Sequence, residues 1–494
     1  MTDQLPHIVF DNSYVRDLEG FYVESYGEPA PAPAVLRLNR NLASELGLDA
    51  DVLSGPGGAE LLTGTSLPDG AASIAMAYAG HQFGGFSPQL GDGRALLVGE
   101  IIDRQGSRRD IHLKGSGRTV FSRGGDGKAA IGPVLREYLI AEAMHALAIP
   151  TTRALAASLT GEDVMRDGPE KGAVLARVAA SHLRVGTFQF FAARSQTDKV
   201  RQLADYAILR HYPEVAGSDD RYLEFFRKVR DAQARLIARW VLAGFVHGVM
   251  NTDNMTISGE TIDYGPCAFI DTYDPKAVFS SIDQFGRYAY GNQPNIAQWN
   301  LARFAETLIE LVSPGDSETA VGKLTDELGH FPFHYQHEWL KGMRKKLGLI
   351  KELPGDLDLA NDLYTAMEGQ NVDFTQLFRA LAGAVRGDSA SARGLFDDPA
   401  TGFDAWLARY LDRCAGEALE PNDRAAAMDR SNPLYIPRNH KVEEALTSAG
   451  AGDMTAFDRL LEVLTRPFET QDGAESYAEP APAGFGHYTT YCGT

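Results

Sequence analysis

The chain has 494 residues, of which 44% are hydrophobic and 23% charged, as expected for a globular protein with two lobes or two to three domains. Its formal net charge of −19 opposes non-specific binding to nucleic acid or anionic membrane, although it allows a local site for ATP. Three cysteines in this length argue against a disulfide framework and a structural zinc site, and they favour a reducing cytoplasm.

Targeting signals are not evident. No apolar run is long enough to cross a membrane. The start of the chain, MTDQLPHIVFDNSYVRDLEG, has two early acids, no apolar core segment and no Arg-rich character, so we expect neither a signal peptide nor a transit sequence. We therefore expect a cytoplasmic protein that binds neither nucleic acid nor membrane.

The first part of the chain divides into an extension and a strand-rich region. Residues 1–75 mix short apolar stretches with Pro and Gly, as in EPAPAPAV, and predict an extension that wraps a core. Residues 76–200 are expected to form a strand-rich N-lobe. In that lobe Asp92-Gly93 indicates a turn, and residues 95–102 are prone to form a strand.

A second strand is predicted in DIHLKGSG, with Ile111 and Leu113 on one face and His112 and Lys114 on the other. A helix is expected to begin near Gly132-Pro133, because proline is favoured in the first turn. Glu137 lies off the centre of the apolar stripe of that helix. TTRALAASLT and GAVLARVAAS then predict two strands around the turn DGPEKG.

The rest of the chain is mostly helical. Residues 201–440 predict a helical C-lobe, with a long helix in RYLEFFRKVRDAQARLIARWVLAGF and another in QWNLARFAETLIEL. Residues 441–494 predict a C-terminal helix and a flexible tail. A strand-rich part followed by a helix-rich part indicates an α+β architecture, with two lobes and a cleft between them.

One polar segment interrupts the helical part, HGVMNTDNMTISGETIDYG at residues 247–265. It predicts a hairpin with Ser258-Gly259 at its tip, which would pair Asn254 with Asp263 beside Asp253. Amide and carboxylate oxygens at that spacing suit Mg²⁺ that carries the phosphates of a nucleotide. The alternative is a surface hairpin with a polar outer face.

The order of these features resembles the protein-kinase signature set. Lys114 stands at the place of the strand lysine that contacts phosphate, and Glu137 at that of its helix partner. Asn254 and Asp263 stand at the places of the two metal ligands. Each match alone has an ordinary explanation, such as a surface lysine or a solvated helix face; their joint order carries the resemblance.

One position departs from the kinase pattern. In kinase-type loops an aspartate precedes the metal-binding asparagine by five residues, and here that position is Val249, which cannot accept a proton. By this criterion the chain resembles a pseudokinase. Asp253, next to Asn254, is a candidate replacement for the missing base.

Longer strings resemble the selenoprotein O family of protein adenylyltransferases over nearly the whole chain. They are GHQFGGFSPQLGDGRA, IHLKGSGRTVFSRGGDGKA, LREYLIAEAMHALAIPTTRALA, HGVMNTDNM, DYGPCAFID and GRYAYGNQPNIAQWNLARFAE. The resemblance implies a protein-kinase-like two-lobed fold that binds ATP in a flipped orientation. It also implies transfer of AMP, with Mg²⁺, to hydroxyl side chains of other proteins.

The resemblance assigns roles residue by residue. Asp253 is implied as the proton acceptor, and Asn254 and Asp263 as metal ligands, with Asp263 also close to ATP. Lys114, paired with Glu137, is implied to contact phosphates. The remaining implied nucleotide contacts are Gly91, Gly93, Arg94, Asp126, Gly127, Arg177 and Arg184. From the residues alone, Arg177 would be an ordinary strand arginine paired with a local carboxylate.

Cys492, third from the end, matches a redox-active position of the family. Bacterial members can pair it with a cysteine downstream of the Asp-Tyr-Gly motif, but the matching region here, DPKAVFSS, has none. Cys267, four residues past Asp263, is the alternative partner, and the sequence leaves a disulfide undecided.

The leading prediction is transfer of AMP from ATP to a Ser, Thr or Tyr hydroxyl of a protein, with release of pyrophosphate. Use of UTP with Mn²⁺ is a related alternative. A protein or small-molecule kinase is a second hypothesis, which Val249 disfavours. A nucleotide-binding scaffold without catalysis is a third, which the joint presence of Lys114, Glu137, Asn254 and Asp263 disfavours.

Overall fold

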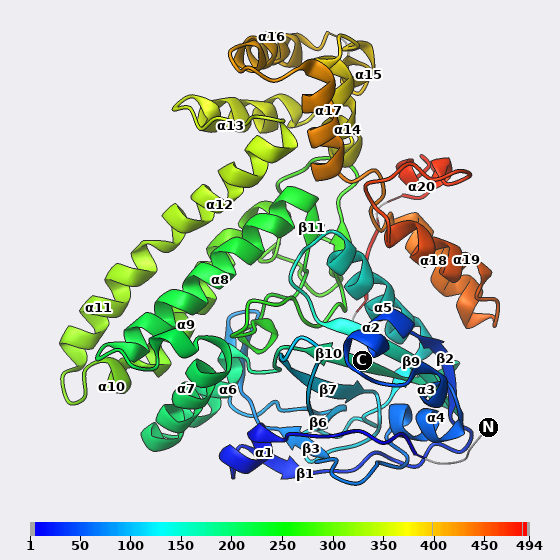
Figure 1. The fold of residues 1–494 in the computed structure, drawn as a ribbon, viewed down its shortest axis with the longest axis vertical. Coiled ribbons are helices and arrows are strands. Elements are labelled where there is room, and N and C mark those ends of the chain that lie inside the picture. The colour runs from blue at the N-terminus through cyan, green and yellow to red at the C-terminus, as the bar shows by residue number, and fades with distance from the viewer. Residues whose placement is uncertain (1–4, 398, 487, 492–494) are drawn as a thin grey trace.

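The computed structural model describes residues 5–397, 399–486 and 488–491. Strands lie mainly in the first part of the chain and helices in the second, around one large antiparallel sheet (Figure 1). This arrangement confirms the expected mixture of helices and sheet. Within the described residues, no helix combines the length and the apolar character that a membrane span requires.

The large sheet has the strand order β1-β3-β6-β7-β10-β9-β2, and β8 pairs with β10. The predicted strands around Lys114 and around the DGPEKG turn are confirmed, and the segment before residue 75 adds a strand at each edge of the sheet. The strands are β1 (Tyr22–Glu24), β2 (Ala34–Leu38), β3 (Ile74–Met76), β6 (Ala95–Ile102), β7 (Arg108–Lys114), β8 (Ala129–Ala130), β9 (Arg153–Met165) and β10 (Pro169–Ala179).

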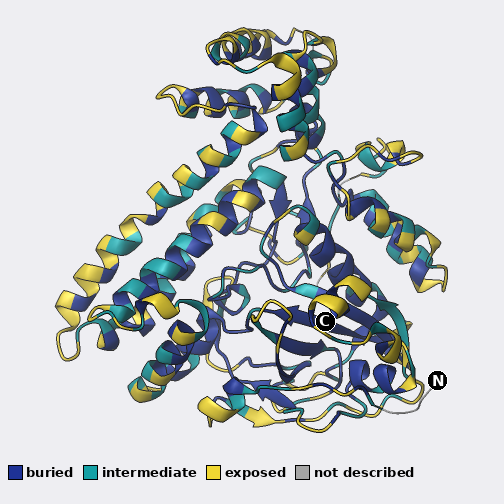
Figure 2. Ribbon diagram, viewed as in Figure 1, coloured by how far each residue is buried: buried dark blue, intermediate teal, exposed yellow. Residues whose placement is uncertain are grey.

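Helices cover both faces of this sheet. On one face α2 (Arg40–Glu45) packs on β9, α4 (Pro56–Thr63) packs on β9 and β10, and α3 (Ala50–Leu53) packs on α4; together they share an apolar core with Ile111 and Leu113. On the other face α5 (Ile131–Ala146) packs on β9 and β10. Its first residue, Ile131, agrees with the predicted helix start near Gly132-Pro133. Figure 2 shows the central strands as buried, which explains why β6 and β10 are rich in apolar residues.

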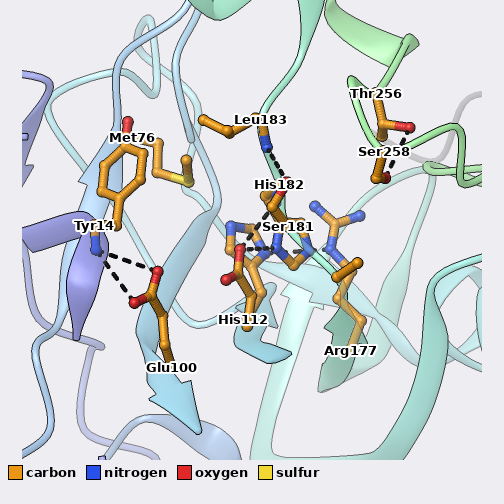
Figure 3. A network of polar contacts seen from close by, with 12 residues as sticks. Tyr14, Met76, Glu100, His112, Arg177, Ser181, His182, Leu183, Thr256 and Ser258 are labelled. Carbon is orange, nitrogen blue, oxygen red and sulfur yellow. Dashed lines mark hydrogen bonds and ion pairs between the residues drawn. The ribbon is translucent and has the colours of Figure 1, made fainter. Parts of the chain in front are cut away.

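The N-terminal segment is tied to the sheet by a buried carboxylate. Both oxygens of Glu100, on β6, accept from the backbone N–H of Tyr14 in α1 (Ser13–Asp17) at 3.2 Å (Figure 3). Tyr206 Oη donates to the same carboxylate at 3.0 Å, and Arg210 pairs with it. A buried carboxylate is tolerated only with such partners, so this cluster fixes the position of the extension.

Helices build the second part of the chain around the long helix α8 (Arg221–Ala243), which confirms the predicted segment. Helices α13 to α17 lie at the top of Figure 1 and share an apolar core with the ends of α8 and α12. The helices are α6 (Val185–Ala192), α7 (Thr197–His211), α9 (Gln293–Thr307), α10 (Ile309–Val312), α11 (Ser317–Gly329), α12 (Phe331–Lys346), α13 (Asp356–Met367), α14 (Phe374–Val385), α15 (Ala390–Arg393), α16 (Thr401–Ala415), α17 (Pro421–Ser431), α18 (Asn439–Gly450), α19 (Thr455–Leu464) and α20 (Glu475–Ala478). Short strands are β4 (Gly80–Gln82), β5 (Gly85–Ser87), β11 (Phe245–Val246) and β12 (Ala268–Phe269).

The predicted hairpin at residues 254–263 is wrong. Thr256 instead forms an antiparallel bridge with Arg184, and Thr261 forms a parallel bridge with Thr151. The two arms of the segment therefore pair with different parts of the chain, and the Thr256 hydroxyl closes the turn by donating to the carbonyl of Glu260 at 2.7 Å. A polar alternating pattern predicts extended backbone but not its pairing partner.

Glu260, within that turn, gives a pH-dependent prediction. Burial raises the pKa of its carboxyl from about 4.5 to about 7, against the lowering effect of bonds from the Ser258 hydroxyl and the Ala180 N–H. The folded state therefore binds this proton more tightly than the unfolded state, and the contribution of Glu260 to stability is lost as pH rises from about 4.5 to about 7.

Glu260→Gln, which stays uncharged, should lack this dependence. We expect the Tm of the parent protein to fall relative to that of the variant as pH rises from about 4.5 to about 7. Above that range the difference between the two Tm values should stay constant. Thermal unfolding at a series of pH values measures this difference; parallel curves for the two proteins would contradict the assignment.

The described part of the C-terminal tail contacts the core. Tyr488 Oη donates to Glu443 at 2.6 Å and accepts from Arg136 at 2.9 Å, and Thr490 Oγ1 donates to the Pro266 carbonyl at 2.9 Å. Cys492 lies outside the described residues. Cys267 is fully buried, and burial raises the pKa of its thiol to about 11, which keeps it protonated and unreactive.

Candidate functional site

A lysine, a glutamate and an arginine from three neighbouring elements meet on one face of the sheet. Arg177 of β10 opposes His112 of β7, so it shares a face with His112 and with Lys114, two residues further on. Lys114 Nζ lies 2.6 Å from Glu137 Oε2 of α5, and Arg177 Nη1 lies 3.1 Å from Glu137 Oε1. The sequence-predicted Lys114–Glu137 pair is therefore formed.

Asp263 completes this cluster from the C-terminal half of the chain. Its carboxylate lies 2.5 Å from Lys114 Nζ, 2.9 Å from Arg177 Nη1 and 3.2 Å from Arg184 Nη1. Burial by itself would raise the pKa of Asp263, but the three cations together lower it well below its ordinary value. The backbone φ of Asp263 is 64°, a left-handed conformation that aspartate adopts more readily than most residues.

Arg184, which precedes α6, is held on several sides. Its Nη1 donates to the backbone carbonyl of Asp253 at 3.0 Å, and its Nη2 lies 3.6 Å from Asp92 Oδ1. Its guanidinium carbon lies 4.4 Å from the centroid of the Tyr78 ring, a cation–π contact. A buried guanidinium fixed in this manner is preorganised for a planar contact with anionic oxygens.

Asp253 lies in a 3₁₀ turn, Thr252–Asn254, against β4. Its Oδ2 accepts from Gln82 Nε2 at 3.3 Å, and its Oδ1 is buried without a hydrogen-bond partner among the described residues. Burial raises the pKa of Asp253 to about 6. A pKa this close to neutral pH suits a carboxylate that accepts a proton during a reaction. A Cβ on Gly80 would lie 2.3 Å from Oδ1, so glycine is required there.

Asn254 and Asp263 are the predicted metal ligands, and both line the same cavity. Asn254 Nδ2 donates to the Val249 carbonyl at 3.1 Å, so the Oδ1 of the same amide points away from that carbonyl. His247 Nε2 lies 2.9 Å from the Ile262 carbonyl, while its Nδ1 accepts from the Val249 N–H at 3.3 Å. His247 thus holds the backbone on either side of the site.

These donors fit a divalent ion that also binds phosphate. Among the described residues, no three His, Cys, Asp or Glu side chains converge as in a site made by protein alone. One amide oxygen and one carboxylate are hard ligands that would hold Mg²⁺ or Mn²⁺ together with phosphate oxygens and water. The donor set is therefore compatible with a metal that arrives with a nucleotide.

The cavity between the sheet and the loop of Asp253 has a volume of about 250 Å³. The predicted site residues that line it are Gly93, Arg94, Lys114, Arg177, Arg184, Asp253, Asn254 and Asp263. Val249, at the place of the kinase base, also lines it. The site residues predicted from distant parts of the sequence therefore converge on one cavity.

Four predicted residues do not line this cavity. Glu137 stands behind Lys114, and Gly91 packs beneath Phe121, where a Cβ would lie 2.3 Å from the ring. Asp126 pairs with Arg166 at 2.8 Å. A Cβ on Gly127 would lie 2.1 Å from a backbone oxygen of the same loop. The last two residues therefore shape the loop that borders the site.

Sequence reasoning missed a histidine network beneath the arginines. Arg177 Nε donates to His112 Nδ1 at 3.2 Å (Figure 3), and His112 Nε2 lies 3.1 Å from Asp92 Oδ2. The arginine donor requires Nδ1 to be the acceptor, so the neutral imidazole carries its proton on Nε2 and donates it to Asp92. In the sequence, the alternation that placed His112 on the same strand face as Lys114 was the signal that could have revealed this network.

The His112 ring also stacks on His182, with centroids 4.2 Å apart. Burial lowers the pKa of both rings, that of His182 to about 3, so both stay neutral. His182 Nδ1 in turn pairs with Asp110 at 2.9 Å. The network places an uncharged acceptor under Arg177, so the carboxylates that pair with this guanidinium are Glu137 and Asp263.

We predict that His112→Ala weakens ATP binding about fivefold, because one buried hydrogen bond that orients Arg177 is worth about 1 kcal/mol. His112→Gln should recover part of the loss, since its amide can accept from Arg177 and donate to Asp92. The Kd for ATP, kcat and thermal unfolding are measured together. Equal Tm losses in both variants without a difference in Kd would indicate a purely structural role.

Comparisons with known proteins agree with this site. A family model described as "Protein adenylyltransferase SelO" matches residues 5–465. The chain is 61% identical to "Protein nucleotidyltransferase YdiU" of Cereibacter sphaeroides strain KD131, over 98% of this chain and 99% of that protein. A protein with the same name in Mycobacterium sp. strain KMS is 58% identical, over 99% of this chain and 100% of that protein. Another in Rhizobium meliloti strain 1021 is 54% identical, over 98% of this chain and 99% of that protein. The chain belongs to the SelO family.

Proposed function

We propose that this protein is a nucleotidyltransferase that transfers AMP from ATP to Ser, Thr or Tyr hydroxyls of proteins and releases pyrophosphate. The family membership supports the reaction class. The observation that carries the proposal is the convergence of Lys114, Arg177 and Arg184 on a single cavity that Asp253 also lines.

Transfer of AMP requires charge stabilisation on the leaving group. The hydroxyl oxygen attacks the α-phosphorus, a new P–O bond forms, and the bond to the β-phosphate oxygen breaks. Negative charge then grows on pyrophosphate. Lys114, Arg177 and Arg184 all line the cavity, so we propose that their donors receive this charge, although each is paired in the structure with one or more of Glu137, Asp263 and Asp92.

Asp253 is proposed as the acceptor of the hydroxyl proton. It is the carboxylate of the cavity that no cation pairs with among the described residues, and its Oδ1 has no hydrogen-bond partner there. Its raised pKa, about 6, makes it more basic than an ordinary aspartate while leaving it ionised at neutral pH. Val249 replaces the usual kinase base with an apolar side chain, which supports AMP transfer over phosphotransfer.

Asn254 and Asp263 are proposed to hold Mg²⁺, with Mn²⁺ as the alternative for a reaction with UTP. When bound, the metal neutralises phosphate charge. Asp263 would hold the metal, and Lys114, Arg177 and Arg184 would contact the phosphates. Gly91, Gly93, Arg94, Asp126 and Gly127 complete the proposed nucleotide site.

We further propose a protein-kinase-like two-lobed fold, with the lobes, extension and C-terminal addition bounded as the sequence predicts, and a cytoplasmic location. The antiparallel sheet with α5 on one face and the helices around α8 support the two lobes. The Lys114–Glu137 pair between β7 and α5 supports the kinase likeness.

A labelling experiment tests the reaction. The protein is incubated with Mg²⁺ and ATP labelled at either the α- or the γ-phosphate, with itself or a candidate protein as acceptor. Protein label from the α position alone is expected. Label from the γ position alone would identify a kinase, and neither label despite ATP binding would identify a scaffold.

A further inference from the structure

A second cavity, of about 370 Å³, lies between α8, α12 and the end of α17. The two long helices run side by side (Figure 1). Its described lining includes one carboxylate, that of Glu338, and six basic side chains, of which Lys346 is buried and has its pKa lowered to about 7 by burial. The basic side chains are Arg235, Arg239, Lys341, Lys345, Lys346 and Arg430. We call this cavity the basic groove.

The charge of the basic groove is unusual for this protein, because the chain as a whole carries −19. Lys341 lies 3.9 Å from Glu338, and Arg239 donates to the Ala148 carbonyl at 2.7 Å. Within the described part of the chain, no carboxylate lies at ion-pair distance from Arg235, Lys345 or Arg430. The groove therefore holds several cations whose charges have no local partner.

Helix dipoles explain only part of this arrangement. Lys345 lies in the last turn of α12 and Arg430 in the last turn of α17, where cations are favoured. Arg235 and Arg239 lie inside α8, and Lys341 lies more than a turn before the end of α12, so the dipole gives them little. Their grouping needs another reason.

The floor of the groove is apolar and closely packed. A Cβ on Gly342 would lie 2.1 Å from Leu242 Cδ1, so this glycine lets α12 approach α8. Lys346 is buried beneath the floor, where its Nζ donates to the Leu242 carbonyl at 2.8 Å and lies 3.9 Å from the Phe378 ring centroid. The exposed cations thus stand above a rigid base rather than on a mobile loop.

We propose that the basic groove docks an acidic, extended segment of the protein substrate. This inference rests on the proposed function, which requires a protein acceptor. Like charges repel an acidic segment from most of this surface, so the groove is the complementary region to which it would be steered.

The spacing of the cations favours an extended chain over a compact anion. Arg235 and Arg239 are one turn apart on α8, and Lys341 and Lys345 are one turn apart on α12, about 6 Å in each case. Alternate side chains of an extended peptide repeat about every 6.6 Å. Two rows at this repeat match successive acidic side chains, whereas a compact anion would reach only one end.

Binding of a fluorescent oligo-glutamate peptide tests the proposal without ATP. Fluorescence anisotropy at physiological ionic strength is measured for the full chain and for the double variant Arg235→Gln and Lys345→Gln. Glutamine keeps length and helix propensity while it removes charge. We expect the Kd to rise about tenfold in this variant. Salt should weaken binding to the parent protein.

The matched control is Lys323→Gln with Arg409→Gln, two exposed helical cations outside the groove that remove the same total charge. Its Kd should stay close to the parent value. Equal weakening in both double variants, or no binding by the parent protein, would overturn the proposal. Inorganic pyrophosphate that displaces the peptide at equal concentration would identify a small-anion site instead.

The two proposals fail separately. Label from the α-phosphate with no peptide binding would leave AMP transfer standing and remove the docking groove. Peptide binding with no α-label would keep an acidic-peptide groove but remove its link to AMP transfer. If the protein both transfers AMP and binds the peptide, the double variant Arg235→Gln and Lys345→Gln should have a higher KM for an acidic protein substrate and the same KM for ATP as the parent protein.

Discussion

Asp263→Asn should reduce metal-dependent AMP transfer by about 10³-fold or more, because the proposed metal and three phosphate-binding cations all depend on this carboxylate. Asparagine also tolerates the left-handed backbone at this position, where φ is 64°. The variant therefore removes charge with little change of backbone. Asp263→Ala should abolish the metal-dependent activity as well. Single-turnover transfer of α-label at saturating Mg²⁺ and ATP measures both losses.

Thermal unfolding without ATP is the control for Asp263. Removal of its charge leaves Lys114 and Arg177 with Glu137 and leaves Arg184 with Asp92, so a lower Tm is expected because all three cations lose one partner. The activity loss must exceed any loss of folded protein. Full turnover in either variant at the same metal concentration would refute the metal assignment.

Asp253→Ala should lower kcat by about 10² to 10⁴, the usual contribution of a general base, and change the Kd for ATP far less. The proposed role of its carboxylate is in the transfer step, whereas the arginines and Lys114 are proposed to bind the phosphates. Rapid-quench measurement of α-label transfer, together with ATP binding, separates the two quantities. An unchanged rate would remove Asp253 as the proton acceptor.

Gly80→Ala is an informative companion to Asp253→Ala. Its new Cβ would lie 2.3 Å from Asp253 Oδ1, so the carboxylate must move although it is still present. An intermediate loss of kcat is expected, since proton transfer depends on position as well as on basicity. A rate equal to that of the parent protein would mean that the location of the carboxylate is unimportant.

Local patterns predicted the elements well where one face is buried. Alternation in DIHLKGSG correctly separated Ile111 and Leu113 from His112 and Lys114, because a strand on a core must alternate. The start of α5 followed from Pro133. The hairpin at residues 254–263 failed because alternation does not identify a partner strand, and Arg184 and Thr151 provide the partners.

The sequence by itself determined the family, the order of strands and helices, and the types of residue that carry the site, because these follow from local spacing and from long shared strings. Only the tertiary structure decided that His112 underlies Arg177, that Gly80 makes room for Asp253, and that cations of α8 and α12 face one groove. These contacts join residues far apart in the chain. Their geometry depends on how sheet and helices pack, which no local pattern encodes.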